Sequence, residues 1–309
     1  MGLMRIDWFN RFLLVVAVAF SLAACSSDDD GDGVQGGGTN ANANVATTDQ
    51  AVLRLEFPRL KGGDSKVIVY RTASSKYDKD RVNYAVEWDC GKKSQRWSCY
   101  QLHQGYTGSY SRVINSYPYD TENLSRDDYV EVDYINKAGY EHGHICPSAD
   151  RKYSYDANYQ TFYMTNMQPQ YHKFNNHNDS GADQGEGLWY RMEEQVRDWV
   201  PRKQTDTLYV CKGGTIDNED QIIERFQGKL IVPRYFFMAI LLKNEMGYRA
   251  VGFWAEQKSN EWRDDEPLSD YAVSIDELER LTGIDFFCNL PDDIEDSVED
   301  HYVPKVWGL

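Results

Sequence analysis

Alternating apolar and polar residues predict half-buried strands at residues 67–71 and 83–89. β-branched and aromatic residues concentrate in three later segments, which we expect to be sheet strands as well. These segments are residues 207–213, 229–242 and 248–257. Pro233 lies inside the second of them and has no backbone N–H to donate, so we expect an edge or a bulge there.

Helical periodicity predicts a helix over residues 188–200, because apolar side chains recur there on one face. The residues of this face are Leu188, Met192, Val196 and Trp199. A second helix is expected after Ser274, since Glu277 follows three residues later as in a capping box and Gly283 is a suitable C-terminal stop. Strands on both sides of a helix, without strict strand–helix–strand alternation, favour the α+β class over a doubly wound sheet.

The first 24 residues have the pattern of an export signal. An apolar run at residues 12–20 follows Arg5 and Arg11 and is too short to span a bilayer comfortably. The signal ends in Leu-Ala-Ala-Cys, which resembles the bacterial lipobox, so Cys25 is expected to carry lipid and become the mature N-terminus. We therefore expect an exported protein that is held at the bacterial outer membrane by its N-terminal lipid alone.

Residues 25–50 are expected to form a flexible linker, because Gly, Asn, Ala and Thr dominate there and large apolar side chains are scarce. The acidic start of this linker, residues 26–30, resembles the export tag of surface lipoproteins and is equally compatible with a solvated charge run. Residues 51–309 are expected to form one domain. The membrane face and the oligomeric state stay open at this point.

The net charge of −16 at pH 7 argues against a protein that grips nucleic acid through many phosphate contacts. Net charge governs long-range steering, however, and does not determine the chemistry of a local site. We expect the acidic balance to lower affinity for long duplexes rather than to exclude phosphodiester chemistry.

Five cysteines remain besides Cys25, and an odd number leaves at least one thiol without a partner in the chain. Cys90 and Cys99 flank a turn-rich connector, and we expect a disulfide between them. No Cys-x-x-Cys pair occurs, which argues against a zinc ribbon.

Several ordered motifs carry the candidate chemistry. Residues 140–147 read Tyr-Glu-His-Gly-His-Ile-Cys-Pro, residues 161–170 end in Asn-Met-Gln-Pro-Gln, and Asn175 precedes Gly-Leu-Trp at residues 187–189. Together they resemble the DNA/RNA non-specific endonucleases, which carry Asp-Arg-Gly-His, then Asn-x-x-Pro-Gln, then a metal-binding Asn and a helix. The resemblance implies the ββα-metal fold, with a central, mostly antiparallel sheet flanked by helices and long loops.

The chain departs from the family pattern at two places. Glu141 and His142 stand where the family has Asp-Arg, and residues 176–186 are inserted before Gly-Leu-Trp. A His replaces a phosphate-binding Arg only in part, because its positive charge is weaker and depends on pH. The insert is rich in Gly, Asn and Asp, so we expect an exposed loop beside the metal site.

The resemblance assigns the general base to His144. A neutral imidazole is a suitable base near pH 7, and the preceding Gly143 lets a substrate backbone approach closely. The resemblance also implies a hydrated Mg²⁺, for which Mn²⁺ is a substitute, held by Asn175, with Asn176 and Asn178 as alternatives. Mg²⁺ keeps most of its waters, so one amide oxygen from the protein suffices.

Glu193 and Arg197 lie four residues apart and therefore share one face of the predicted helix. A surface salt bridge is the usual meaning of such a pair. The resemblance implies instead that Glu193 orients metal-bound water and that Arg197 binds the scissile phosphate. It also implies that Asn166, the fourth candidate catalytic residue, helps to organise the site.

Three further residues are candidates for substrate binding. His142 occupies the position of the family Arg, Gln170 matches the last residue of the Pro-Gln motif, and Arg151 is close enough in sequence to replace the missing Arg. On a strand, His142 and His144 would face the same side. That geometry leaves open a rival interpretation, in which the two imidazoles are ligands of zinc or nickel.

The resemblance thus implies an exported Mg²⁺-dependent endonuclease that cuts DNA and RNA without strong sequence preference and leaves 5′-phosphate ends. An alternative, favoured by the acidic charge and by His142, is a catalytically weak surface lipoprotein that uses the nuclease fold as a binding module. A transition-metal binder built on the two histidines is a third hypothesis.

Overall fold

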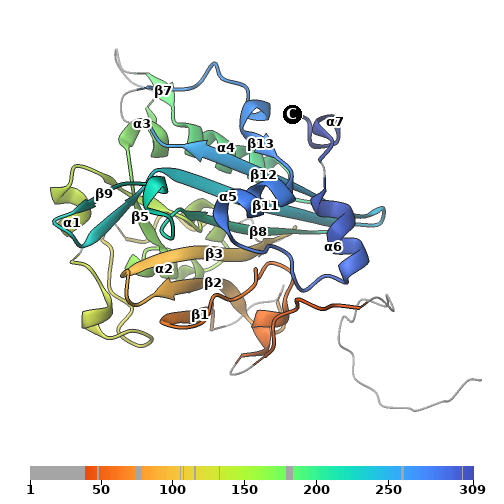
Figure 1. Cartoon of the computed structure of the whole chain (residues 1–309), viewed down its shortest axis with the longest axis horizontal. Coiled ribbons are helices and arrows are strands. Elements are labelled where there is room, and N and C mark those ends of the chain that lie inside the picture. The colour runs from red at the N-terminus through yellow and green to blue at the C-terminus, as the bar shows by residue number, and fades with distance from the viewer. Residues whose placement is uncertain are drawn as a thin grey trace, which may run out of the picture. The chain divides into compact units, whose positions relative to one another are not determined.

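A seven-stranded antiparallel sheet forms the centre of the computed structural model (Figure 1). Its strand order is β1-β2-β3-β8-β11-β12-β13, and each neighbouring pair is antiparallel. The strands are β1 (Ser65–Arg71), β2 (Val82–Asp89), β3 (Ser94–Leu102), β8 (Thr207–Gly214), β11 (Tyr235–Asn244), β12 (Gly247–Glu256) and β13 (Ala272–Val273). The predicted α+β class is confirmed, because helices accompany this sheet without βαβ alternation.

The structure describes residues 39–46, 49–73, 78–104, 106, 108–114, 116–131, 133–178, 184–258, 261–300 and 302–309. The predicted signal peptide, the lipidated Cys25 and the linker as far as residue 38 lie outside the described residues. Within the described ranges, none of the helices has the length and apolar character needed to cross a membrane.

Three two-stranded ribbons and seven short α-helices complete the part of the fold that the structure describes. The ribbons are β4 (Glu141–His144) with β5 (Met167–Gln170), β6 (His177–Asn178) with β7 (Gly185–Glu186), and β9 (Ile222–Phe226) with β10 (Leu230–Pro233). The helices are α1 (Asp133–Lys137), α2 (Tyr155–Gln160), α3 (His172–Asn175), α4 (Leu188–Asp198), α5 (Ile275–Thr282), α6 (Asp292–Glu299) and α7 (Pro304–Trp307). Short 3₁₀ turns are η1 (Gln50–Leu53), η2 (Arg126–Asp128), η3 (Ser148–Arg151), η4 (Met164–Asn166), η5 (Glu219–Gln221) and η6 (Leu268–Tyr271).

The sheet is covered on both faces, which explains why its central strands read as continuous apolar runs. Along β11, Phe236 and Met238 enter one hydrophobic cluster, whereas Phe237 and Ala239 enter another on the opposite face. Helix α4 packs on the first face, and α5 and α6 pack on the second, in front of the sheet in Figure 1. The two faces therefore separate α4 from the α5–α6 pair.

The predicted strands and helices are confirmed, with one division. The segment at residues 229–242 is split into β10 and β11, and the pairing register shifts between Val232 and Pro233, as expected for a proline without a backbone donor. Ser274 caps α5 and Gly283 ends it in the left-handed conformation, φ 69°. Strand β3 was not predicted, because polar residues occupy several of its buried positions.

The predicted Cys90–Cys99 disulfide is wrong. All five cysteines of the described residues are free thiols. Strand β3 begins directly opposite the end of β2, with Asp89 paired to Ser94, so Cys90 sits in the tight turn. Cys99 is carried along β3 until it faces Ala85, well away from that turn.

The folded part begins before residue 51, unlike the linker expected to extend to residue 50. The buried Asn44 side chain donates to the Pro58 carbonyl at 3.0 Å and accepts from the Leu60 N–H at 3.0 Å. Asn42 donates to the carboxylates of Asp285 and Glu295. Part of the predicted 176–186 loop also differs, because its two ends pair as β6 and β7; residues 179–183 lie outside the described part.

Candidate active site

A cavity of about 630 Å³ opens where β4, α3, α4 and the segment around Arg112 converge. Five of the predicted site residues line it, and the first and last of them, His142 and Arg197, are 55 positions apart in the sequence (197 − 142). The five are His142, His144, Asn175, Glu193 and Arg197. The structure therefore brings the predicted base, metal ligand and helix pair to one place.

The β4–β5 ribbon presents both histidines to this cavity. His142 pairs with Pro169 and His144 with Met167, so the two imidazoles lie on the same side of β4, as alternation along a strand requires. The His142 ring stacks on Tyr117, with ring centroids 3.9 Å apart and an interplanar angle of 5°. The Trp189 indole N–H donates to the His144 carbonyl at 3.2 Å, which fastens α4 to β4.

Position 143, between the two histidines, requires a glycine because the Gln170 side chain leaves no room for a Cβ atom. A Cβ at this position would lie 2.2 Å from Oε1 of Gln170 and 2.6 Å from its Cγ. Gln170 is fully buried beneath β4 and does not line the cavity, so its prediction as a substrate-binding residue is wrong. It supports the ribbon from below because the β5 register turns its side chain inward.

His144 is held as a neutral imidazole. Burial lowers its pKa to about 3, and the positive charges of Arg112, His142 and Lys212 act in the same direction. Among the described residues, the buried Nε2 has no hydrogen-bond partner. His144 lines the cavity, and its ring stays unprotonated far below pH 7, so it is the candidate proton acceptor there. The ordinary imidazole pKa assumed from the sequence does not apply, because the site is desolvated and cationic.

Glu193 is paired with a residue that the sequence did not indicate. Lys212 of β8 is 1% exposed, and its Nζ donates to Glu193 Oε1 at 2.8 Å. The same ammonium lies 4.5 Å from the ring centroid of Trp189. Burial raises the pKa of Glu193, whereas Lys212 and Arg197 lower it. Lys212 was missed because β8 reads locally as an ordinary buried strand.

Arg197 does not form the direct salt bridge with Glu193 that their spacing suggests. Its guanidinium donates to Asp150 Oδ1 at 3.0 Å and to the adjacent Glu194 carboxylate. The nearly buried Asp150 fixes one side of Arg197 and leaves the group in the wall of the cavity. Such a guanidinium presents planar donors suited to phosphate oxygens.

Asn166 organises the backbone and does not line the cavity. Its Oδ1 accepts from the Cys146 N–H at 2.8 Å, and its Nδ2 donates to the carbonyls of Cys146 and Thr161, both at 2.8 Å. The side chain is fully buried, so its amide ties the end of β4 to the turn before β5. Asn166 is therefore a positioning residue rather than a catalytic one.

Arg151 does not replace the missing family Arg, and that prediction is wrong. Its guanidinium is fully buried, lies over the Tyr100 and Tyr106 rings at 4.5 and 5.0 Å, and donates to the Gln101 carbonyl. A guanidinium that does line the cavity, besides Arg197, is that of Arg112, which sits 4.4 Å over the Phe162 ring. Arg112 was missed because it lies in a long polar segment without periodicity.

The residues present fit a hydrated hard cation at Asn175. This side chain ends α3 at the cavity wall, and the Glu193 carboxylate lines the same space. The amide of Asn176 is engaged with His172 at 3.1 Å, and Asn178 is not part of the lining. Oxygen donors with room for water suit Mg²⁺. No third His, Cys, Asp or Glu in the described ranges joins His142 and His144 as a metal ligand, which argues against the transition-metal hypothesis.

Comparison with known proteins agrees with this geometry. A family model described as DNA/RNA non-specific endonuclease matches residues 61–293. The chain is 28% identical over 254 residues to a nuclease of Nostoc sp., covering 78% of this chain and 84% of that protein. It is 26% identical over 223 residues to the mitochondrial nuclease EXOG of Xenopus laevis, covering 69% of this chain and 58% of that protein.

A solved structure of EndoG, from a complex with the inhibitor EndoGI, superposes with a TM-score of 0.59 at 18% sequence identity. The match covers 79% of this chain and 94% of that chain, so the predicted ββα-metal nuclease fold is shared. With the family model spanning most of the chain, this protein belongs to the DNA/RNA non-specific endonuclease family of hydrolases.

Proposed function

We propose that this protein is a Mg²⁺-dependent endonuclease that hydrolyses phosphodiester bonds in DNA and RNA without strong sequence preference. The observation that carries the proposal is the convergence, in one cavity, of the unpartnered imidazole nitrogen of His144 with Asn175, Glu193 and Arg197. A pure binding module needs phosphate-binding cations but no buried, neutral base.

His144 acts as the general base. Its Nε2 would accept a proton from the water that attacks phosphorus. Burial lowers the pKa of the ring, so the imidazole is neutral in the free protein and is also a weaker base than an exposed histidine. The Trp189–His144 hydrogen bond and the Asn166 amide fix the position of the β4 backbone, so the ring needs little reorganisation.

Asn175 and Glu193 hold and orient the hydrated metal. Mg²⁺, or Mn²⁺ in its place, supplies charge stabilisation for the phosphoryl and leaving oxygens. Asn175 would contribute its amide oxygen as the direct protein ligand. Glu193, paired with the Lys212 ammonium at 2.8 Å, would accept hydrogen bonds from the surrounding water and keep that water in place.

Arg197 and Arg112 bind the substrate phosphate from two walls of the cavity. Both are guanidinium groups, which form paired hydrogen bonds with phosphate oxygens. His142, stacked flat on Tyr117, adds a polar ring beside them where most of the family has an Arg. Contacts of this kind go to phosphate and carry no base information, which accounts for a lack of sequence preference.

The anchored location is part of the same proposal. Residues 1–24 would direct export, and lipid on Cys25 would hold the protein at the bacterial outer membrane. Metabolic labelling with a radioactive fatty acid should mark the wild type and not the Cys25→Ala variant. Equal labelling of both would overturn the anchor.

The second candidate is a catalytically weak binding module, which the net charge of −16 and the replacement of Arg by His142 favour. The deciding experiment incubates the purified protein with circular single-stranded DNA, plasmid and RNA, each with Mg²⁺, Mn²⁺ or EDTA. The nuclease proposal predicts metal-dependent cutting of all three and 5′-phosphate ends. Retention of the nucleic acids on the protein without cutting, with every metal, would support the binding module instead.

A further inference from the structure

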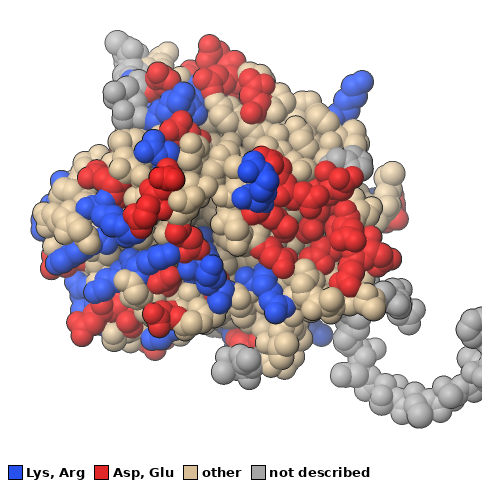
Figure 2. Space-filling model, in the orientation of Figure 1, with Lys and Arg blue, Asp and Glu red and all other residues tan. Residues whose placement is uncertain are grey.

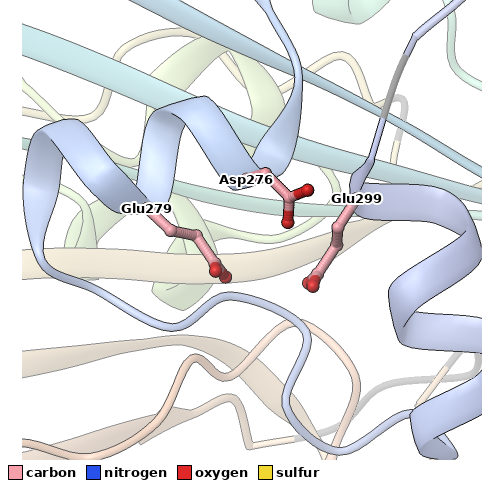
Figure 3. Close-up of side chains that lie close together, drawn as sticks. All are labelled: Asp276, Glu279 and Glu299. Atoms are coloured by element: carbon pink, nitrogen blue, oxygen red, sulfur yellow. The ribbon is translucent and has the colours of Figure 1, made fainter.

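Three carboxylates meet between α5 and α6, far from the catalytic cavity in the fold. Asp276 and Glu279 lie one turn apart on α5, and Glu299 is the last residue of α6. One oxygen from each lies within 4.8 Å of the others. Figure 3 shows the Glu279 and Glu299 carboxylates facing the same space between the two helices, with Asp276 at its edge.

Glu299 is the unusual member of this cluster. It is only 6% exposed, and its Oε1 has no hydrogen-bond partner among the residues that the structure describes. A buried carboxylate oxygen without a donor is costly, because it loses its hydration and gains nothing in return. The oxygen points to a ligand that the cluster is built to hold.

No cation of the protein occupies that role. Within the described chain, Lys and Arg make no salt bridge to Asp276, Glu279 or Glu299; the nearby Arg280 pairs with Glu277 instead. Glu299 also stands at the C-terminal end of its helix, where the helix dipole disfavours a negative charge. Figure 2 shows acidic side chains gathered over this side of the molecule.

The electrostatic cost of burying these carboxylates appears as raised pKa values. Burial, with the neighbouring carboxylates, raises the pKa of Glu279 to about 8 and that of Glu299 to about 10. The pKa of the buried Glu295 is raised to about 7 for the same reasons. One Glu279 oxygen is already used, since Oε1 accepts from the Phe286 N–H at 2.7 Å.

We propose that Asp276, Glu279 and Glu299 form a binding site for a divalent cation of the calcium class. All donors are carboxylate oxygens, which select hard cations over zinc or copper. Ligands on opposite sides of Ca²⁺ are separated by about twice its 2.3–2.6 Å bond length, which accommodates the spacing of these three oxygens. Asp276 is exposed, so water completes the coordination from the open side.

The site is structural and separate from the proposed catalytic metal. Ile275 and Leu278 of α5 and Val298 of α6 belong to the hydrophobic cluster on one face of the sheet, whereas α4 packs on the other face. A cation shared by α5 and α6 would join the two helices directly. It therefore stabilises the C-terminal part of the fold without touching substrate.

Calcium binding is measured by equilibrium dialysis and calorimetry on the Asn175→Ala protein, which lacks the proposed catalytic ligand. One Ca²⁺ per chain is expected, and Glu299→Gln or Asp276→Asn in the same background should weaken binding at least 10-fold. Glu245→Gln, an exposed carboxylate on the β11–β12 turn, is the matched control and should bind as before. Absence of Ca²⁺ binding to the folded Asn175→Ala protein, or binding unchanged by both cluster variants, would overturn the proposal.

Thermal unfolding gives an independent readout. Saturating Ca²⁺ should raise the Tm of the Asn175→Ala protein by about 5 °C. Ca²⁺ should raise the Tm of Glu299→Gln in the same background much less than that of its parent, because one ligand of the cation is gone. A Ca²⁺-induced shift of equal size in parent and variant would contradict the site, whatever the nuclease assays show.

Discussion

Lys212 opposes the effect of burial on Glu193, the carboxylate proposed to orient metal-bound water. Burial alone would favour a protonated Glu193, since it raises the pKa of that group, and the ammonium at 2.8 Å opposes this. Removing one partner of such a buried pair typically costs about 3–5 kcal/mol of stability, because the other charge is left without compensation. The pair thus joins β8 of the sheet to α4. It also favours the ionised form of Glu193 that the proposed mechanism needs.

Lys212→Met should therefore shift the pH dependence of cleavage. Without the ammonium, the Glu193 pKa rises further, so the carboxylate is lost at a higher pH and the acid limb of kcat/KM moves upward. In the wild type we expect this limb to reflect Glu193, whose pKa burial raises, rather than His144, whose pKa is lowered to about 3. The measurement is kcat/KM across pH 4–9, with Lys243→Met of β11 as the control. A loss of activity that is equal at every pH would contradict the role of Lys212.

Arg112→Ala should lower kcat/KM by about 10- to 100-fold, because one charged hydrogen bond to phosphate disappears. The Tm should stay close to that of the wild type, since the side chain is exposed. Arg126→Ala is a matched control: this exposed Arg also lies over an aromatic ring, that of Tyr119 at 3.9 Å, but outside the cavity. Equal losses of activity in the two variants would refute a specific role for Arg112.

At the scale of elements, the β4–β5 ribbon is the part on which the site depends. It carries both histidines on one side and rests on Gln170, which leaves no room for a side chain at position 143. The ribbon is short, and hydrogen bonds to its neighbours hold it in place. Asn166 holds one end, and Trp189 of α4 donates to the His144 carbonyl. A small displacement of its backbone moves His144 relative to Asn175 and should cost activity.

Gly143→Ala should destabilise the protein by about 1–3 kcal/mol and reduce kcat, because the added methyl group meets the Gln170 side chain at 2.2–2.6 Å. Gln170→Ala removes the obstructing atoms. The double variant should recover part of the activity lost in Gly143→Ala, and urea unfolding should show non-additive free energies. Strictly additive losses would mean that the two residues do not oppose each other.

The ordered motifs predicted most of the site, and local patterns predicted most of the sheet. Glu193 and Arg197 lie on the helix predicted from periodicity. His144 and Asn175 reach the same cavity from β4 and α3, and only the motifs singled them out. The error at Arg151 concerns the direction of its side chain. Arg151 and its neighbour Asp150 lie in the same 3₁₀ turn, but their side chains form hydrogen bonds with different partners.

The missed residues lie outside the reach of local patterns. Lys212 meets Glu193 only because β8 passes beneath α4, and nothing within either segment encodes that meeting. The Cys90–Cys99 prediction failed for a related reason, since the register of the β2–β3 pair carries Cys99 beyond the turn. Long-range packing and strand register, rather than propensity, decided all of these cases.

At the scale of the whole molecule, charge is distributed unevenly. The net charge is −16, yet the cavity receives the guanidinium groups of Arg112 and Arg197. Acidic side chains gather instead over the α5–α6 side, on the opposite face of the sheet from α4 (Figure 2). The protein is thus suited to a few local phosphate contacts and not to wrapping of a long duplex.

The salt dependence of cleavage should accordingly be shallow. With two or three phosphates neutralised, log kcat/KM for plasmid DNA should fall with log salt at a slope of roughly −2 to −3. Steady-state rates between 20 and 300 mM KCl, at fixed Mg²⁺, measure this slope. A slope steeper than about −5 would require an extended basic surface and would contradict the compact site.

The most direct test of the account is plasmid nicking by the purified protein beside its His144→Ala variant, each with Mg²⁺ and with EDTA. His103→Ala, a histidine outside the cavity, is the control. We predict Mg²⁺-dependent nicking by the wild type and by His103→Ala, and a rate lower by about 10²- to 10⁴-fold in a folded His144→Ala protein. Nicking that persists in His144→Ala, or a folded wild type that cuts neither DNA nor RNA with any divalent metal, would contradict the central claim.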